Sequence, residues 1–216
     1  MATTYPPALA CNASTIPVPT VFGAEILSLT ANVVSNFSAL VSEQVHPGHP
    51  TSSVSGIDFC NITVTYTHPG QNDEIHVVAW LPIDNWNGNL QAVGGGGYAA
   101  GLDAMAYMGM AGAMGEGYAT SSTDAGVPVE GLPLESAFLL SPGNVNLYAV
   151  QNLASVSLKD QVCTLDLPTH TPTPLCFITN VLSAQITMVS KVLTRTWNTT
   201  GSDNQSFDLE LLRQAS

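Results

Sequence analysis

Four consecutive glycines, Gly94 to Gly97, constrain this chain more than any other feature. They follow the short apolar run Leu90–Val93, which comes after the turn dipeptide Asn87-Gly88 and is therefore expected to form a strand. Glycine has no Cβ, so it adopts backbone angles that other residues avoid and lets a ligand approach the main chain closely. A glycine run at the end of a buried strand therefore favours a loop whose backbone N–H groups converge on an anion.

The patterns on both sides of the glycine run predict an α/β fold. Ile57–His68 and Asp73–Leu81 alternate in strand fashion around a Pro-Gly turn, so we expect a β-hairpin. After the glycines, Leu102–Met114 is rich in methionine and small residues, which is typical of a helix that packs closely on a sheet. Tyr118–Ser122 is expected to be the next strand. The order of hairpin, strand, glycine-rich turn, helix and strand predicts a sheet covered by helices.

Four other segments are patterned less clearly. Glu25–Leu40 fits both strand alternation and helical spacing, and its Thr, Val, Ser and Asn content favours strands. Val45–Ser55 and Thr123–Pro142 are expected to be loops. Asn144–Gln161 is amphipathic and predicts a helix. The face expected to be buried consists of Leu147, Val150, Leu153, Ala154, Ser157 and Leu158.

Charge is scarce and strongly acidic. The 216 residues carry a formal net charge of -12, and no Lys or Arg precedes Lys159. Nucleic-acid binding requires basic residues that neutralise phosphates, so it is not expected, and neither is binding to an anionic membrane surface. No stretch approaches the roughly 20 apolar residues of a transmembrane helix. Because 45% of the residues are hydrophobic, the chain can bury a core, and we expect one domain.

The pattern W-L-P-x-x-x-W-N-G-x-x-x-x-x-G-G-G-G, from Trp80 to Gly97, resembles the tannase and feruloyl esterase family. The runs Phe59–Val64 and Gly117–Asp124 agree with this resemblance. Members are secreted serine ester hydrolases with an α/β-hydrolase core and an inserted lid domain. The resemblance therefore implies that residues 23–161 form the N-terminal part of an α/β-hydrolase fold, after an extended arm over residues 1–22.

The same resemblance defines which catalytic parts the chain is expected to contain. The family's nucleophilic Ser follows a Cys, and an Asp and a His complete the triad; this sequence has no Cys-Ser and no G-x-S-x-G. His170 is the only histidine after the matching region, and the sequence around it does not resemble a catalytic site. We therefore expect the lid, the triad and the family's calcium site to lie beyond this chain. Gly95 and Gly96 remain as candidate backbone donors of an oxyanion hole.

The resemblance also implies secretion and a disulfide between Cys11 and Cys60; two buried thiols are the alternative. Glycosylation sequons at Asn12, Asn36 and Asn61 suit a secreted chain, although the start, MATTYPPALA, has neither the basic nor the apolar region of a signal peptide. No CxxC or HxxxH spacing occurs, so we expect no metal site and no cofactor.

The C-terminal part departs from the family pattern. Residues 162–185 interrupt a helical pattern, and joining Gln161 directly to Ile186 would restore a continuous helix like that of the family. The residues near the ends of this segment can be encoded by codons that contain the splice signals of a short intron. We therefore predict that 162–185 is a retained intron, and that 186–216 resumes the helix and then diverges.

Three functional interpretations remain open. The first is an ester hydrolase that takes small aromatic esters through an acyl-serine, but is truncated before its nucleophile and inactive as written. The second is a non-catalytic secreted binding module. The third is a nucleotide-binding protein, because Gly95–Ala100 loosely fits G-x-G-x-x-A after a strand. A preceding hairpin and the lack of an acid about 20 residues further on argue against the third. Ester preference and oligomeric state do not follow from the sequence.

Overall fold

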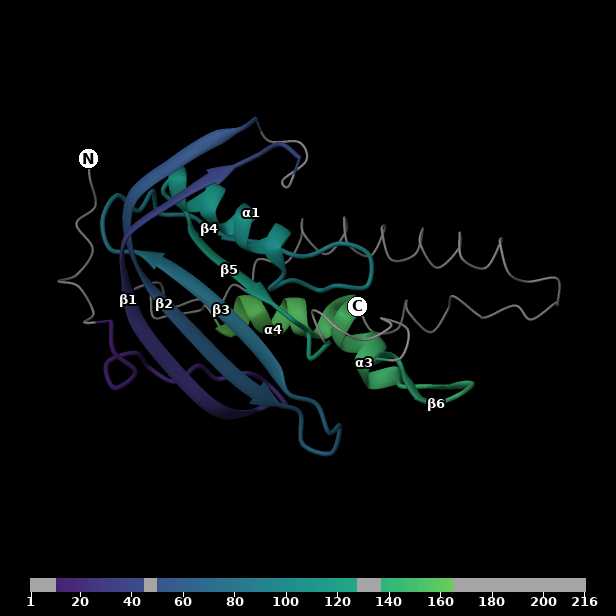
Figure 1. Cartoon of the computed structure of the whole chain (residues 1–216). Coiled ribbons are helices and arrows are strands. Elements are labelled where there is room, and N and C mark those ends of the chain that lie inside the picture. The colour runs from purple at the N-terminus through teal and green to yellow at the C-terminus, as the bar shows by residue number, and fades with distance from the viewer. Residues whose placement is uncertain (1–10, 45–49, 128–136, 165–216) are drawn as a thin grey trace.

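A computed structural model describes residues 11–44, 50–127 and 137–164. Within these residues, five strands form one mixed sheet in the order β1-β2-β3-β5-β4, with helices on both of its faces (Figure 1). This arrangement confirms the predicted α/β class. The elements are β1 (Glu25–Val41), β2 (Ser52–Thr67), β3 (Ile75–Pro82), β4 (Leu90–Ala92), α1 (Ala104–Gly115), β5 (Ala119–Thr123), β6 (Leu139–Ser141), β7 (Asn144–Val145), α3 (Leu147–Gln151), the π-helical turn η1 (Asn152–Val156) and α4 (Ser157–Thr164).

The sheet combines an antiparallel meander with one parallel crossover. β1, β2 and β3 pair antiparallel in chain order, as the predicted hairpin requires. β4 then leads through α1 to β5, which pairs parallel with β4 and inserts between β4 and β3. Since parallel neighbours need a crossover connection, the helix after the glycine run follows from this topology.

β1 confirms the strand interpretation of Glu25–Leu40, but the loop expected over Val45–Ser55 is wrong at its end. Ser52–Ser55 already belong to β2, and Val54 pairs with Ala39. Gly56 has a φ of 68° inside β2 and lies beside an irregularity of β1. The glycine therefore accommodates a bulge within the long β1–β2 hairpin, and the strand continues through it.

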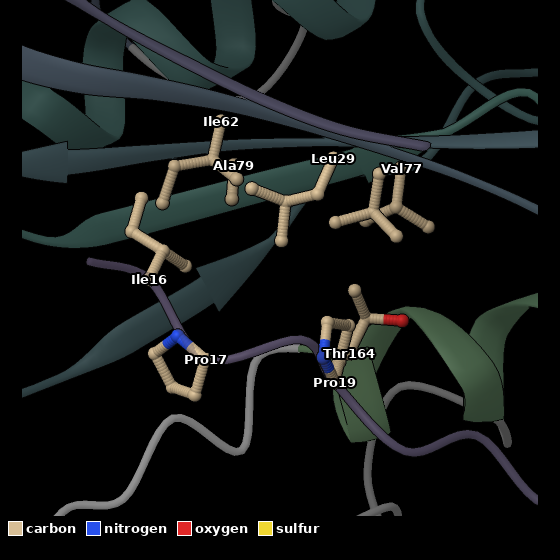
Figure 2. Close-up of a pocket in the computed structure, with 9 residues that line it drawn as sticks. Ile16, Pro17, Pro19, Leu29, Ile62, Val77, Ala79 and Thr164 are labelled. Carbon is tan, nitrogen blue, oxygen red and sulfur yellow. The ribbon is translucent and has the colours of Figure 1, made fainter. Parts of the chain in front are cut away.

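One face of the sheet is covered by the N-terminal residues and by α4 (Figure 2). Cys11 and Cys60 form a disulfide with an S–S distance of 2.05 Å, which confirms the pairing that the resemblance implied. Ile16 packs on Ile62 and Ala79 of the sheet. Residues 11–22 contain no helix or strand, and the first ten residues of the expected arm lie outside the described part of the chain.

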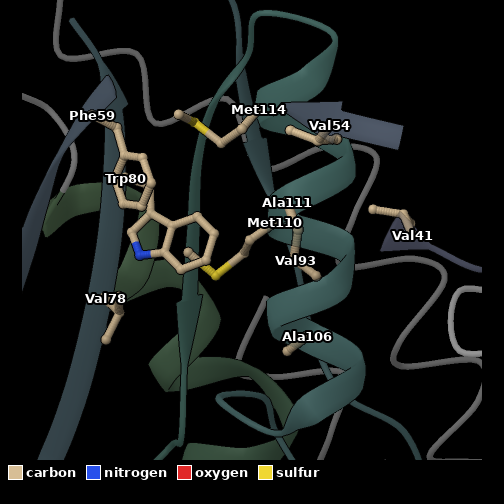
Figure 3. Close-up of a cluster of buried hydrophobic side chains, with 10 residues drawn as sticks. All are labelled: Val41, Val54, Phe59, Val78, Trp80, Val93, Ala106, Met110, Ala111 and Met114. Carbon is tan, nitrogen blue, oxygen red and sulfur yellow. The ribbon is translucent and has the colours of Figure 1, made fainter. Parts of the chain in front are cut away.

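The opposite face is covered by α1, which contributes the main hydrophobic core (Figure 3). Asp103 caps the N-terminus of α1, because its Oδ1 accepts a hydrogen bond from Ala106 N at 2.7 Å. Met110 is fully buried and belongs to the same cluster as Trp80 of β3. A Cβ on Gly115 would come 2.7 Å from Cγ2 of Val54. The small residues of α1 therefore allow the close packing that its sequence predicted.

The segment expected as one amphipathic helix, Asn144–Gln161, is instead β7, α3, η1 and α4. The expected buried face is also wrong in part, because Leu147 is 68% exposed. The π-helical turn adds a residue to the helical turn and so rotates the following residues relative to the α-helical pattern. The buried face is therefore largely polar: Asn152, Ser157, Asp160, Gln161 and Thr164, together with Leu158.

Two other predictions concern the same end of the chain. The loop expected over Thr123–Pro142 contains β6, which pairs with β7 around Gly143, a glycine with a φ of 77°. Of the predicted intron at 162–185, residues 162–164 continue α4. The rest of that segment and residues 186–216 lie outside the described residues, so both predictions stay predictions.

Candidate functional site

The candidate site lies where the parallel strands β4 and β5 end side by side. Val93 N donates to the carbonyl of Ser121 at 2.7 Å, which extends the pairing of the two strands to the start of the glycine run. The loop Gly94–Gly101 leaves β4 at this edge, and the loop Asp124–Val127 leaves β5 there. In α/β sheets, ligands bind outside the carboxyl ends of the strands, so both loops stand at a favoured position.

The glycine loop closes on itself. Gly95 N donates to the carbonyl of Ala100, and Ala99 N donates to the carbonyl of Gly96 at 3.2 Å. A Cβ on Gly95 would collide with the Ala99 carbonyl oxygen and lie 3.0 Å from the carbonyl carbon of Ala100. Gly95 must therefore be glycine because the backbone crosses over it.

This closure distinguishes the two glycines that were predicted as backbone donors of an oxyanion hole. The N–H of Gly95 is committed to Ala100, so it cannot also donate to an added anion in this conformation. Gly96 is exposed, and a Cβ added to it would meet no atom within 4 Å. Its N–H pairs with no backbone acceptor among the described residues. Of the two glycines, Gly96 is therefore the one whose N–H is not committed to a backbone acceptor within the loop.

The end of the loop is held by β5. Leu102 N donates to Oγ of Ser122 at 3.2 Å, and Leu102 has a φ of 58°. A Cβ on Gly101 would come 2.7 Å from the carbonyl oxygen of Thr123 and collide with Oγ of Ser122. This close contact of main chains, with one hydroxyl as an anchor, fixes the exit of the glycine loop against the sheet.

The Thr123-Asp124 pair fixes the second loop by hydrogen bonds. Thr123 Oγ1 donates to the carbonyl of His76 at 2.8 Å and accepts from Ala125 N at 3.2 Å. Asp124 Oδ1 accepts from His76 N and from Gly126 N, both at 2.9 Å. The pair therefore ties the end of β5 to the start of β3.

His76 lies at this junction with both ring nitrogens near carboxylates. Its Nδ1 is 2.7 Å from Oδ2 of Asp124, and its Nε2 is 3.6 Å from Oε1 of Glu74. Burial, and then the charge of Asp124, raise the pKa of the nearby Tyr107 hydroxyl. Every ion pair among residues 11–44, 50–127 and 137–164 is made by a histidine, which reflects the shortage of Lys and Arg.

The described residues contain little else that resembles a ligand site. No group of three or more His, Cys, Asp or Glu among them could hold a metal ion. None of their helices combines the length and apolar content needed to cross a bilayer. The crevice of Figure 2 lies against α4 and the N-terminal residues, and Thr164 is the one polar residue in its lining. It is therefore a gap in packing and not a place for chemistry.

A buried polar cluster that the sequence patterns do not predict lies on the α4 side of the sheet. His68 contacts Asp73 and Asp160, and Asn152 donates to Asp73. Asp160 belongs to a helical face that the apolar periodicity assigned to solvent. The available signal was Asp73 after the Pro-Gly turn, since a carboxylate there can bond the turn backbone.

Comparisons with known proteins agree on one group of relatives. No protein-family model matches the chain. The chain is 41% identical over 148 residues to a probable feruloyl esterase from Arthroderma benhamiae, an alignment that covers 68% of this chain and 26% of that protein. It is 28% identical over 132 residues to a tannase from Aspergillus oryzae, covering 61% of this chain and 20% of the tannase.

A solved structure supports the same relationship. The tannin acyl hydrolase from Aspergillus niger superposes with a TM-score of 0.54 and 27% sequence identity, over 74% of this chain and 30% of that chain. The chain therefore spans 26% and 20% of the length of the curated relatives that it matches.

Proposed function

Because the chain belongs, over its matched residues, to the tannase and feruloyl esterase family, we propose that the full-length protein is a carboxylic ester hydrolase. Its substrate is a small aromatic ester, cleaved through an acyl-serine intermediate. The observation that carries this proposal is the 41% identity over 148 residues to a probable feruloyl esterase. The relatives and the solved structure are all ester hydrolases by name, so neither the binding module nor the nucleotide-binding protein is favoured.

The fold supports an α/β-hydrolase sheet as the frame of this site. The hairpin β2–β3, the strand β4, the glycine loop, α1 and β5 follow in the order that opens such a sheet. Among the described residues, β4 pairs with β5 alone, and Leu90 is 42% exposed on it. We propose that further parallel strands of the full-length protein add beyond β4.

The glycine loop would contribute part of the oxyanion hole. When a serine Oγ attacks the ester carbonyl, negative charge develops on the carbonyl oxygen, and a fixed N–H donor stabilises it. The N–H of Gly96 has no backbone partner among the described residues, while the hydrogen bonds of Gly95 and Leu102 hold the loop in place around it. One such donor contributes about 3 kcal/mol to transition-state stabilisation in a complete site.

We propose that this chain lacks the nucleophile. The sequence contains no G-x-S-x-G and no Cys-Ser, so we propose that residues 1–216 alone do not hydrolyse esters. The triad Ser, Asp and His, the lid and the family's calcium site would belong to a longer form of the protein.

The compartment is inferred from covalent chemistry. The Cys11–Cys60 disulfide is typical of an oxidising compartment, which supports an extracellular location. Asn12 and Asn36 are exposed and are accessible as glycosylation sites, whereas Asn61 is half-buried and its Oδ1 is buried without a partner. Asn61 is therefore the least suitable of the three sequons.

The test compares purified 1–216 with a spliced, full-length form on a chromogenic phenolic ester. We expect turnover by the full-length form only. In that form, Gly96→Pro removes the N–H donor and should lower kcat about 100-fold or more, whereas Gly96→Ala keeps the N–H and should retain activity. Turnover by 1–216 that a serine-directed inhibitor blocks would show that the chain holds a nucleophile after all.

A further inference from the structure

A buried cluster joins the β2–β3 hairpin to α4, on the sheet face opposite α1. Its centre is His68, the residue that follows β2, with 7% of its side chain exposed. Nδ1 lies 2.7 Å from Oδ2 of Asp73, and Nε2 lies 3.2 Å from Oδ2 of Asp160 on α4. The side chains of Asp73 and Asp160 are 10% and 4% exposed, so bulk water has little access to either contact.

Asp73 is the ionised member of the cluster. Its Oδ1 accepts from His68 N at 2.7 Å and from Thr67 Oγ1 at 3.0 Å, and its Oδ2 accepts from Asn152 Nδ2 at 2.9 Å. Burial alone would raise the pKa of Asp73, but these donors outweigh it and hold the pKa below its usual range. This carboxylate therefore acts only as an acceptor toward the ring of His68.

Asp160 has fewer donors, and burial raises its pKa above the usual range despite the opposing effects of His68 and Lys159. The other titratable group against the cluster is Tyr66, whose ring meets that of His68 edge to face at 5.6 Å. Burial, and then Asp160, Asp124 and Asp73, raise the pKa of the Tyr66 hydroxyl, so it remains neutral. The charge of the cluster is therefore set by His68 and the two carboxylates.

The two contacts of the His68 ring, with Asp73 and with Asp160, together require two protons. An ionised carboxylate only accepts hydrogen bonds, and a neutral imidazole carries a single N–H. The contact with Asp73 uses the proton on Nδ1. The contact between Nε2 and Asp160 therefore needs a second proton, held on either atom. Without it, a ring lone pair would face an ionised oxygen at 3.2 Å in a buried site, where repulsion is weakly screened.

We propose that this second proton is a latch, which keeps α4 docked on the β2–β3 hairpin while it is bound and releases α4 when it is removed. His68 and Asp160 share this proton, while Asp73 remains ionised. In the unfolded chain, a histidine loses its proton at about pH 6.5. Above that pH the folded chain binds more protons than the unfolded chain, so the folding equilibrium constant falls with rising pH, by up to about tenfold per pH unit.

The test measures urea unfolding of the 216-residue chain from about pH 6 to about pH 9 at constant ionic strength. Asp160→Asn places an amide N–H opposite Nε2 and needs no shared proton, so its stability should lose this pH dependence. Asp84→Asn makes the same change at an exposed position and should keep the wild-type slope. An Asp160→Asn variant with the wild-type slope would overturn the latch.

A second measurement needs no variant. Nuclear magnetic resonance of the ring nitrogens of His68 and the carboxyl carbon of Asp160 reports where the protons lie. At about pH 6 we expect either a doubly protonated ring or a protonated Asp160. A neutral ring beside an ionised Asp160, with α4 still docked, would refute the proposal.

Discussion

Replacing Gly95 by alanine should damage the glycine loop, whereas the same change at the next residue should not. A Cβ on Gly95 would collide with the Ala99 carbonyl oxygen and lie 3.0 Å from the carbonyl carbon of Ala100. These are main-chain atoms, so a rotamer change cannot relieve the overlap. At Gly96 a Cβ meets nothing within 4 Å, and the residue does not have a positive φ.

The expected change in unfolding free energy for Gly95→Ala is the sum of three contributions. Forcing extra volume into a packed site costs roughly 1–3 kcal/mol. Moving the loop also breaks the hydrogen bond from Gly95 to Ala100, which contributes about 1 kcal/mol. Alanine also lowers the conformational entropy of the unfolded chain, which stabilises the folded state by about 0.4–1 kcal/mol. We therefore expect Gly95→Ala to lose about 1–3.6 kcal/mol of unfolding free energy and Gly96→Ala to gain about 0.4–1 kcal/mol.

Urea denaturation followed by tryptophan fluorescence tests this pair, since Trp80 is buried in the core. The midpoint should fall for Gly95→Ala and rise slightly for Gly96→Ala, with the m-value unchanged in both. Equal midpoints for the two variants would mean that the loop moves freely, and the argument that Ala99 and Ala100 exclude a side chain would then fail.

Three other perturbations test the fold. Removing the Cys11–Cys60 disulfide by a double change to alanine opens a loop of sequence separation 49 and should cost about 4 kcal/mol of unfolding free energy; an unchanged urea midpoint would contradict this. Met110→Ala should cost about 2–5 kcal/mol, and Met105→Ala, 46% exposed on the same helix, less than about 0.5 kcal/mol; similar losses in thermal unfolding would refute the assignment of the core. Because the pKa of Asp73 is lowered, its contribution is present above about pH 3.9 and is lost as the pH falls through the folded pKa; Asp73→Asn should flatten this acid limb of the stability profile.

Strand alternation and loop chemistry predicted much of the fold. Ile62, Val64 and Tyr66 share one buried face of β2, as their period of two indicated. The helix α1 and the strand β5 lie where the patterns after the glycine run predicted them. These predictions succeeded because each depends on local spacing, which the sequence displays directly.

Predictions that depended on contacts between distant residues failed. The π-helical turn shifts the helical register, so Asp160 is buried although its position in the apolar pattern faces solvent. Its partner His68 is 92 residues away, and no periodicity reports that pairing. In the glycine run, Gly95 and Gly96 look alike in the sequence. Only the path of Ala99 and Ala100 shows that the N–H of Gly95 is occupied, whereas that of Gly96 has no backbone acceptor among the residues that the structure describes.

β1 has a practical consequence for handling the protein. It is the outermost strand of the sheet in the part of the chain that the structure describes, where one row of its backbone groups pairs with no strand, and many proteins block such an edge with lysine. Here three register shifts interrupt β1, and Ser28–Val34 is the longest stretch that pairs with β2 without irregularity. A single lysine in place of exposed Thr30 or Asn32 within this stretch should therefore hinder edge-to-edge pairing and keep concentrated samples soluble.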